Sequence, residues 1–315
     1  MLEEMIIGEP CKKQMFEQLS GIDFVGLFLD GDHLKQKISH AIVGTLKALL
    51  TRYAKRETCA RALVLRNLPV DACIPATPFD SSAVVLGKVP ITQLTLLSLA
   101  VNLGTPIGFS SENNGAIIHN ISPMKDKKNT KSGQGAAEPL SMHSDFAFSD
   151  HRPDWLILMC LRNEDRIPTG ICFVEQICQS LTPEELALLM SPSFFIFPPE
   201  SSLLKEPRMD AILAQRGNEL ISRFNRDKCK GQTASAQAVL DKFAAIADEL
   251  ACEVVLTAGD VLIFDNKAVL HRRRSFEAKY DGTDRWLQRV YCKAKNTAKN
   301  IEAELIRDLA INGGV

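Results

Sequence analysis

Three residues of this chain have the types and spacing to hold one metal ion. His143 and Asp145 are separated by a single residue, and His271 follows the strand-like run 260–264. If His143 and Asp145 lie on one strand, their side chains point to the same face, because a strand repeats every two residues. With His271 from a distant strand, two imidazoles and a carboxylate would occupy one face of an octahedron. The other face would stay open, as in non-heme Fe(II) oxygenases.

Two arginines after His271 could each bind a carboxylate. The odd-numbered residues of the run 285–291, which include Arg285 and Arg289, share one face if this run is a strand. The two arginines would then lie about 13 Å apart along it. Each guanidinium suits a bidentate pair with a carboxylate, which lysine cannot form. A metal with open positions beside two such groups predicts two carboxylate-bearing ligands.

These segments resemble the clavaminate synthase-like branch (TauD/TfdA superfamily) of the Fe(II)/2-oxoglutarate-dependent dioxygenases, which includes asparagine, arginine and lysine hydroxylases. The closest likeness is C-terminal, from Gly259 to Asn266 and on through the histidine and both arginines. Residues 65–71, 75–78 and 103–109 are similar to the family's early strand, its proline loop and the segment before its core sheet. The resemblance therefore covers most of the chain.

The resemblance implies a role for each residue of the metal and co-substrate sites. His143, Asp145 and His271 would be the Fe(II) ligands. Arg285 would bind the distal carboxylate of 2-oxoglutarate, assisted by Thr169.

It also implies a substrate subsite. Arg289 would bind the α-carboxylate of an amino acid, and Glu112 and Asn120 occupy positions similar to substrate contacts of amino-acid hydroxylases. Asp227 would meet a substrate amine from a second lid segment. Ordinary ion pairs, turns or strand surface are the alternatives for these residues, and His119 is a further candidate for lining the pocket.

The activity implied is hydroxylation of an unactivated carbon of a free L-amino acid or close derivative, using O2 and releasing succinate and CO2. Halogenating relatives lack the carboxylate ligand, so Asp145 favours hydroxylation, although desaturation and ring closure use the same chemistry. One alternative is a dioxygenase that acts on a carrier-tethered residue or a sulfonate. Another is a jelly-roll sensor that binds metal without turnover.

Two positions depart from the family pattern. Many members carry glutamate at the position of Asp145, which keeps the same ligand oxygens on a shorter side chain. The family usually has a small residue after the distal histidine, whereas here the run Arg272–Arg274 follows His271. These arginines could alter the mouth of the pocket, or they could face solvent and the sheet edge. They bear on the identity of the substrate more than on the reaction.

Composition narrows the class of protein. The apolar content of 45% and charged content of 24% are those of an ordinary globular protein. A net charge of −1 gives no electrostatic case for nucleic acid or an anionic membrane. The nine cysteines are scattered without Cys-x-x-Cys spacing, which predicts reduced thiols. No signal peptide is evident, and apolar windows such as 94–103 are far below the roughly 18 residues of a membrane span. We therefore expect a cytoplasmic enzyme with small-molecule partners; the sequence indicates no oligomeric state.

The hydrophobic pattern predicts helices first and strands later. Helices are expected in 10–57 and at 90–103, 182 onward and 235–252. Strands are expected at 62–65, 82–86, 116–121, 155–160 and 170–174. A mobile loop at 124–138 and an irregular stretch at 198–234 complete the pattern.

This order predicts an α+β fold with a double-stranded β-helix (jelly-roll) core flanked by helices. We expect a single domain, 1–315, with a helical part at about 1–60 and a core at about 61–315. A helical lid insertion would occupy about 180–250. Metal ligands that are distant in sequence would become neighbours in such a core.

Overall fold

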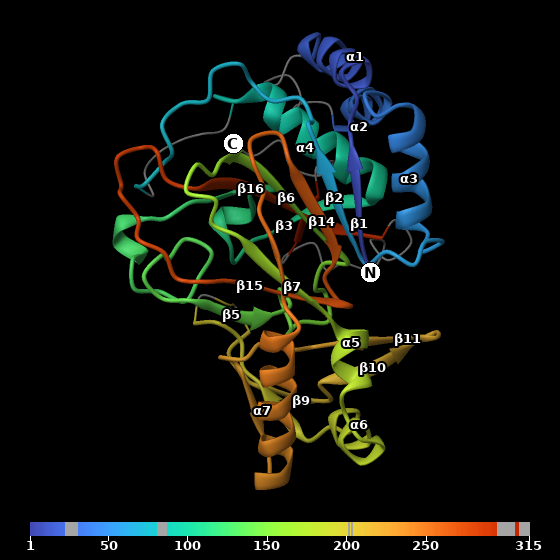
Figure 1. Cartoon of the computed structure of the whole chain (residues 1–315), viewed down its shortest axis with the longest axis vertical. Helices are drawn as coiled ribbons and strands as arrows, with labels where there is room; N and C mark the ends of the chain where they lie inside the picture. Colours follow the sequence, from blue (N-terminus) through green and yellow to red (C-terminus); the bar gives the residue numbers. More distant parts are fainter. Residues whose placement is uncertain (23–30, 81–86, 201, 203, 295–305, 309–315) are drawn as a thin grey trace.

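The structure is a computed structural model that describes residues 1–22, 31–80, 87–200, 202, 204–294 and 306–308. It contains helices, two larger sheets and an inserted lobe (Figure 1). The expected strand at 82–86 lies outside the described residues.

A large sheet forms the centre of the molecule. Its order is β1 (Leu2–Ile6), β2 (Ala62–Arg66), β14 (Val261–Asp265), β6 (Trp155–Arg162), β16 (Trp286–Lys293), β3 (Thr105–Phe109) and β17 (Ile306–Asp308), and β4 (Ile118–Ile121) also pairs with β16. Only β1 and β2 run parallel among these pairs. The strands expected at 62–65, 116–121 and 155–160 are confirmed, within a few residues at their ends.

Four helices cover one face of the large sheet, as the pattern of 10–57 and 90–103 predicts (Figure 1). They are α1 (Glu9–Ser20), α2 (Gly31–His40), α3 (Gly44–Ala54) and α4 (Pro90–Leu103). Helix α4 is apolar on nearly every side because it packs against the other three and against the sheet. Its start is fixed from a distance, since the Asp71 carboxylate accepts hydrogen bonds from the backbone N–H groups of Ile91 and Thr92.

A second, antiparallel sheet packs against the other face. Its order is β13 (Cys252–Val254), β7 (Thr169–Phe173), β15 (Val269–Arg273) and β5 (Leu140–His143). Alternate residues of β6 serve the two layers: Ile157 packs under the helices, whereas Leu158 packs between the sheets. One buried cluster joins Phe264 and Tyr291 of the large sheet to Ile171 of the small one. The sheets therefore share a core.

The insertion forms a lobe at the bottom of Figure 1. It consists of α5 (Val174–Gln179), α6 (Pro183–Leu189), β8 (Phe194–Ile196), β9 (Arg208–Asp210), β10 (Leu213–Arg216), β11 (Glu219–Ser222), β12 (Cys229–Gly231) and α7 (Ala234–Glu249). The helix expected from 182 onward is confirmed as α6, and Thr182 and Glu185 form the capping box that starts it. The lobe has its own buried core, centred on Phe194, Phe224 and Phe243.

Two expectations for this region were wrong. The stretch 198–234 contains β9 to β12 rather than irregular chain, because these short strands pair with β8 or with each other. Helix α7 ends at Glu249 rather than at Cys252, which begins β13. Leu250, within the range expected to be helical, follows the last residue of α7 and is 39% exposed.

No helix among the described residues is both long and apolar enough to cross a membrane. A 3-10 turn occurs at Asn113–Gly115. The loop at 124–138 contains another, Lys125–Lys127, and the mobility of this loop stays a prediction.

A buried ion pair holds the end of β14. Asp265 is 1% exposed and pairs with Arg56 after α3 and with Arg216 of β10, the latter at 2.6 Å. Burial alone would raise the pKa of Asp265, but the charges of Arg56 and Arg216 outweigh it and lower the pKa. Its carboxylate therefore stabilises the fold fully above the ordinary aspartate pKa of about 3.9. This contribution fades as the pH falls through the lowered folded-state pKa.

We predict that Asp265→Asn lowers the free energy of unfolding by about 3 kcal/mol at pH 7, because Arg56 and Arg216 lose the buried carboxylate between them, and Arg216 keeps only Glu219. Urea denaturation at pH 7 and at pH 3 measures the effect, and the gap between variant and wild type should shrink in acid. Asp126→Asn, on the exposed 3-10 turn, is the control. An equal gap at both pH values would contradict the prediction.

Candidate active site

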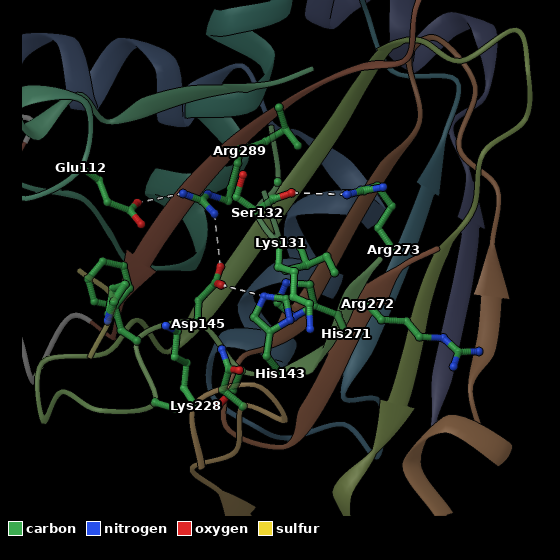
Figure 2. A pocket seen from close by; sticks show the side chains of 18 of the residues that line it. Glu112, Lys131, Ser132, His143, Asp145, Lys228, His271, Arg272, Arg273 and Arg289 are labelled. Carbon is green, nitrogen blue, oxygen red and sulfur yellow. Dashed lines mark hydrogen bonds and ion pairs between the residues drawn. The ribbon is translucent and has the colours of Figure 1, made fainter. Parts of the chain in front are cut away.

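The predicted metal ligands meet between the two sheets. His143 ends β5 and lies directly across from His271 of β15 in the strand register. Their ring centroids are 4.1 Å apart, and His143 Nε2 is 3.2 Å from Asp145 Oδ1. One ligand atom from each of the three residues lies within 4.8 Å of the others (Figure 2). This spacing suits a single ion.

Asp145 reaches this cluster by a different route from the one expected. Strand β5 ends at His143, and residues 145–148 form a turn in which Phe146 has a φ of 55°. The two-residue strand repeat therefore does not aim Asp145. The Asp145 N–H donates to Asn266 Oδ1 at 2.8 Å, and Asn266 Nδ2 donates to the Asp145 carbonyl at 2.9 Å. Asn266, fully buried after β14, fixes the backbone that carries the carboxylate.

The protonation states of the cluster match those of a metal site. Burial opposes ionisation of Asp145, but its contact with His143 and the charge of Arg289 hold its pKa well below the usual range. Burial, with the neighbouring His143, lowers the pKa of His271 to about 3, so its imidazole is neutral. His143 Nδ1 donates to the Ser141 carbonyl at 2.8 Å, which leaves Nε2 for a ligand. His271 Nδ1 is buried without a partner among the described residues. An ionised carboxylate and a neutral imidazole are the forms that bind a divalent metal.

Arg285 is a buried cation with no carboxylate partner among the described residues. Its guanidinium is 6% exposed and donates to Thr169 Oγ1 at 2.8 Å, while its Nε has no partner among the described residues. Burial, and next the positive charge of Arg273, lowers the pKa of Arg285 to about 10. An unpaired buried guanidinium is costly unless an anion joins it. Arg285 and Thr169 therefore fit the distal carboxylate of 2-oxoglutarate.

Arg289 is held by a network beside the triad. It donates to Glu112 at 2.9 Å and to Asp145 at 3.4 Å (Figure 2). It also donates to His119 Nδ1 at 3.0 Å and stacks on Tyr291. His119 Nε2 donates to the Ala116 carbonyl at 2.7 Å, which fixes the ring. Burial, with Arg289, lowers the pKa of His119 to about 3. His119 is thus a neutral acceptor that orients Arg289. Its place opposite Arg289 in the β4–β16 pairing could not be read from the sequence.

A cavity of about 260 Å³ lies beside the triad. Its polar lining includes the triad, Thr169, Arg285, Arg289 and Glu112, and its apolar lining includes Phe146, Phe148, Ile196 and Phe197. Lys131, Ser132 and Gly133 of the 124–138 loop line it as well. The other two predicted substrate contacts are not among the lining residues. Asn120 accepts from Trp286 and Gln288, whose strand positions face the helical layer, and Asp227 pairs with Lys131 at 2.8 Å.

The three arginines after His271 go to different places. Arg272 pairs with Asp248 and Glu253, and the exposed Arg274 also pairs with Glu253. Arg273 is 4% exposed and donates to the carbonyls of Ser132, Ala136 and Glu138. Arg273 therefore ties the 124–138 loop to the strand that carries His271 (Figure 2).

Residues 208–291 match the model of the taurine catabolism dioxygenase TauD, TfdA family. L-asparagine oxygenase of Streptomyces coelicolor is 31% identical over 258 residues, which cover 80% of this chain and 77% of the relative. Enduracididine beta-hydroxylase of Streptomyces hygroscopicus is 30% identical over 273 residues, covering 77% and 79%. The chain belongs to the TauD/TfdA dioxygenase family.

Solved structures of family members share the fold. Asparagine oxygenase in complex with Fe(II), 2S,3S-3-hydroxyasparagine and succinate superposes with a TM-score of 0.83 at 26% identity, covering 93% of this chain and 94% of that one. The non-heme iron oxygenase OrfP in complex with Fe and alpha-ketoglutaric acid gives 0.82, also at 26% identity, covering 93% and 94%. This TauD/TfdA member is accordingly an iron- and 2-oxoglutarate-dependent dioxygenase of mixed helix and sheet content.

We predict that Asn266→Ala weakens metal binding by roughly 10- to 100-fold, because the backbone of Asp145 loses both anchors. Calorimetric titration with Co(II) measures the affinity, and circular dichroism checks the fold. Asn102→Ala, which removes similar amide-to-backbone hydrogen bonds in α4, should leave the affinity unchanged. Wild-type affinity in Asn266→Ala would show that the turn alone holds Asp145.

Proposed function

We propose that this enzyme hydroxylates an unactivated carbon of a free L-amino acid, with release of succinate and CO2. The observation that carries the proposal is the pair of arginines on one face of the run 285–291. Arg285 has no carboxylate partner in the part of the chain that the structure describes, while Arg289 stands 2.9 Å from Glu112 beside the triad. One cation is set for a co-substrate carboxylate, and one cation with an adjacent acid is set for an α-amino acid.

In this proposal His143, Asp145 and His271 hold Fe(II), which with 2-oxoglutarate and O2 supplies the oxidising chemistry. Arg285 and Thr169 orient 2-oxoglutarate through its distal carboxylate. In this proposal β5 and β15, which carry His143 and His271, belong to a jelly-roll core. The whole chain, 1–315, forms one domain. We also propose that the enzyme is cytoplasmic. The aromatic wall of Phe146 and Phe148 keeps water from the reacting carbon.

The substrate backbone is held by opposite charges. Arg289 binds the α-carboxylate, and Glu112 accepts the α-ammonium. Burial and the charge of Asp145 raise the pKa of Glu112, although Arg289 opposes this. An arriving ammonium favours its ionised form. His119 keeps Arg289 in place during exchange of substrate for product.

The test combines purified protein, Fe(II), ascorbate and 2-oxoglutarate with a pool of L-amino acids. Succinate release coupled to a mass gain of one oxygen atom in an amino acid supports the proposal. If no amino acid stimulates succinate release, the proposal is wrong, and a carrier-tethered substrate or a sensor is favoured instead.

We predict that Asp145→Ala abolishes coupled turnover, because two imidazoles alone leave the ion without its anionic ligand. Succinate and hydroxylated product are both quantified by mass spectrometry. Asp126→Ala on the exposed turn serves as the control. Wild-type coupling in the Asp145 variant would remove this residue from the metal site.

We predict that Arg285→Lys raises the KM for 2-oxoglutarate about 10-fold or more, because a point charge replaces the bidentate fork. Initial rates of succinate formation at varied 2-oxoglutarate measure the effect. Arg52→Lys, on the exposed side of α3, is the matched control. An unchanged dependence on 2-oxoglutarate would exclude Arg285 as its carboxylate ligand.

A further inference from the structure

The charges that line the cavity are mostly positive. Beyond Asp145, the only acid among its described lining residues is Glu112. Six cations share the lining: Lys131, Lys228, Arg272, Arg273, Arg285 and Arg289. A cavity lined by cations among apolar side chains favours an anionic ligand, because charges interact more strongly there than in bulk water.

Several of these cations are already neutralised. Arg289 faces Glu112 at 2.9 Å, and Lys131 faces Asp227 at 2.8 Å. Arg272 has its two acids outside the cavity. Arg285 is set for the distal carboxylate of 2-oxoglutarate.

Lys228 is different. It lies just before β12, where its N–H donates to the Asn225 carbonyl at 3.0 Å and its carbonyl accepts from the Phe197 N–H at 2.8 Å. The backbone is thus fixed on the cavity wall, and the side chain is half-buried there (Figure 2). Its ammonium makes no hydrogen bond or ion pair within the described part of the chain.

The charges of the proposed complex leave Lys228 in excess. Fe(II), Asp145, the 2-oxoglutarate dianion, Arg285, Arg289 and Glu112 sum to zero, and the zwitterionic end of an amino acid adds nothing. Lys228 and the buried Arg273 then remain positive. The guanidinium of Arg273 already donates hydrogen bonds to loop carbonyls. A substrate side chain with one negative charge would neutralise Lys228, the cation of the two whose charged group has no partner among the described residues.

We infer that the substrate is an L-amino acid with a side-chain carboxylate, and that Lys228 is the residue that selects it. The inference rests on the proposed function and deepens it. A side-chain cation would meet Lys228 and no free acid, since Asp227 is held by Lys131. An amide would gain a hydrogen bond without the charge.

The test compares amino acids of matched length with three side-chain ends. L-glutamate, L-glutamine and L-ornithine form one set, and L-aspartate, L-asparagine and L-2,4-diaminobutyrate form the other. Coupled succinate release gives kcat/KM, and calorimetry under anaerobic conditions with Fe(II) and 2-oxoglutarate gives the dissociation constant. We expect one dicarboxylic amino acid to exceed its amide by about 10-fold, and the diamino acid to be poorest.

Three variants locate the effect. Lys228→Met should raise KM for the dicarboxylic substrate about 10-fold with a smaller change in kcat. Lys228→Glu should reverse the order of acid and diamino acid. Lys230→Glu, exposed on β12 and outside the cavity lining, should keep the wild-type order.

Each contrary outcome has one meaning. A wild-type preference for the amide or the diamino acid, or an unchanged order in Lys228→Glu, overturns this inference and leaves amino-acid hydroxylation standing. If no amino acid of any class binds or stimulates turnover, the proposed function itself fails and the inference falls with it.

Discussion

The pairing of β15 with β5 is the constraint on which the site depends. It sets His271 across from His143, so that two imidazoles distant in sequence face each other at 4.1 Å. The small sheet gives these rings a rigid base, and the shared core with the large sheet buries them. Because one ion must contact both rings and Asp145, a slip in this register would dismantle the centre. Everything else in the cavity is arranged around that register.

Burial without full charge compensation is the second organising feature. Arg273 and Arg285 are both nearly inaccessible, and burial lowers the pKa of each to about 10. Folding tolerates them because loop carbonyls and Thr169 supply partial hydrogen bonding. The positive charge of Arg285 is left without an acid among the described residues. In the proposed function, the distal carboxylate of 2-oxoglutarate would compensate it, so a group that costs stability in the free enzyme would orient the co-substrate.

The buried Arg273 also connects the 124–138 loop to the strand that carries the metal-ligand candidate His271. Arg273 follows His271 by two residues on β15, so both side chains face the cavity side of the strand. Its guanidinium binds the carbonyls of the loop that carries Lys131 and Ser132. The strand that supplies a metal ligand therefore also positions part of the cavity wall.

The sequence by itself determined the residue types of the centre, the shared face of Arg285 and Arg289, and the capped start of α6. A shared strand face follows from the two-residue repeat, and a helix cap follows from residue types at a fixed spacing, so both can be read from the sequence. Tertiary structure decided the rest: Asn266 rather than the strand repeat aims Asp145, and His119 meets Arg289 only through strand pairing. Asn120 lies on the face of the large sheet that is turned toward the helices, because β4 pairs with β16 in this register. Spacing along the chain shows which side chains share a face of one element, but partners on different elements are chosen by how those elements pack.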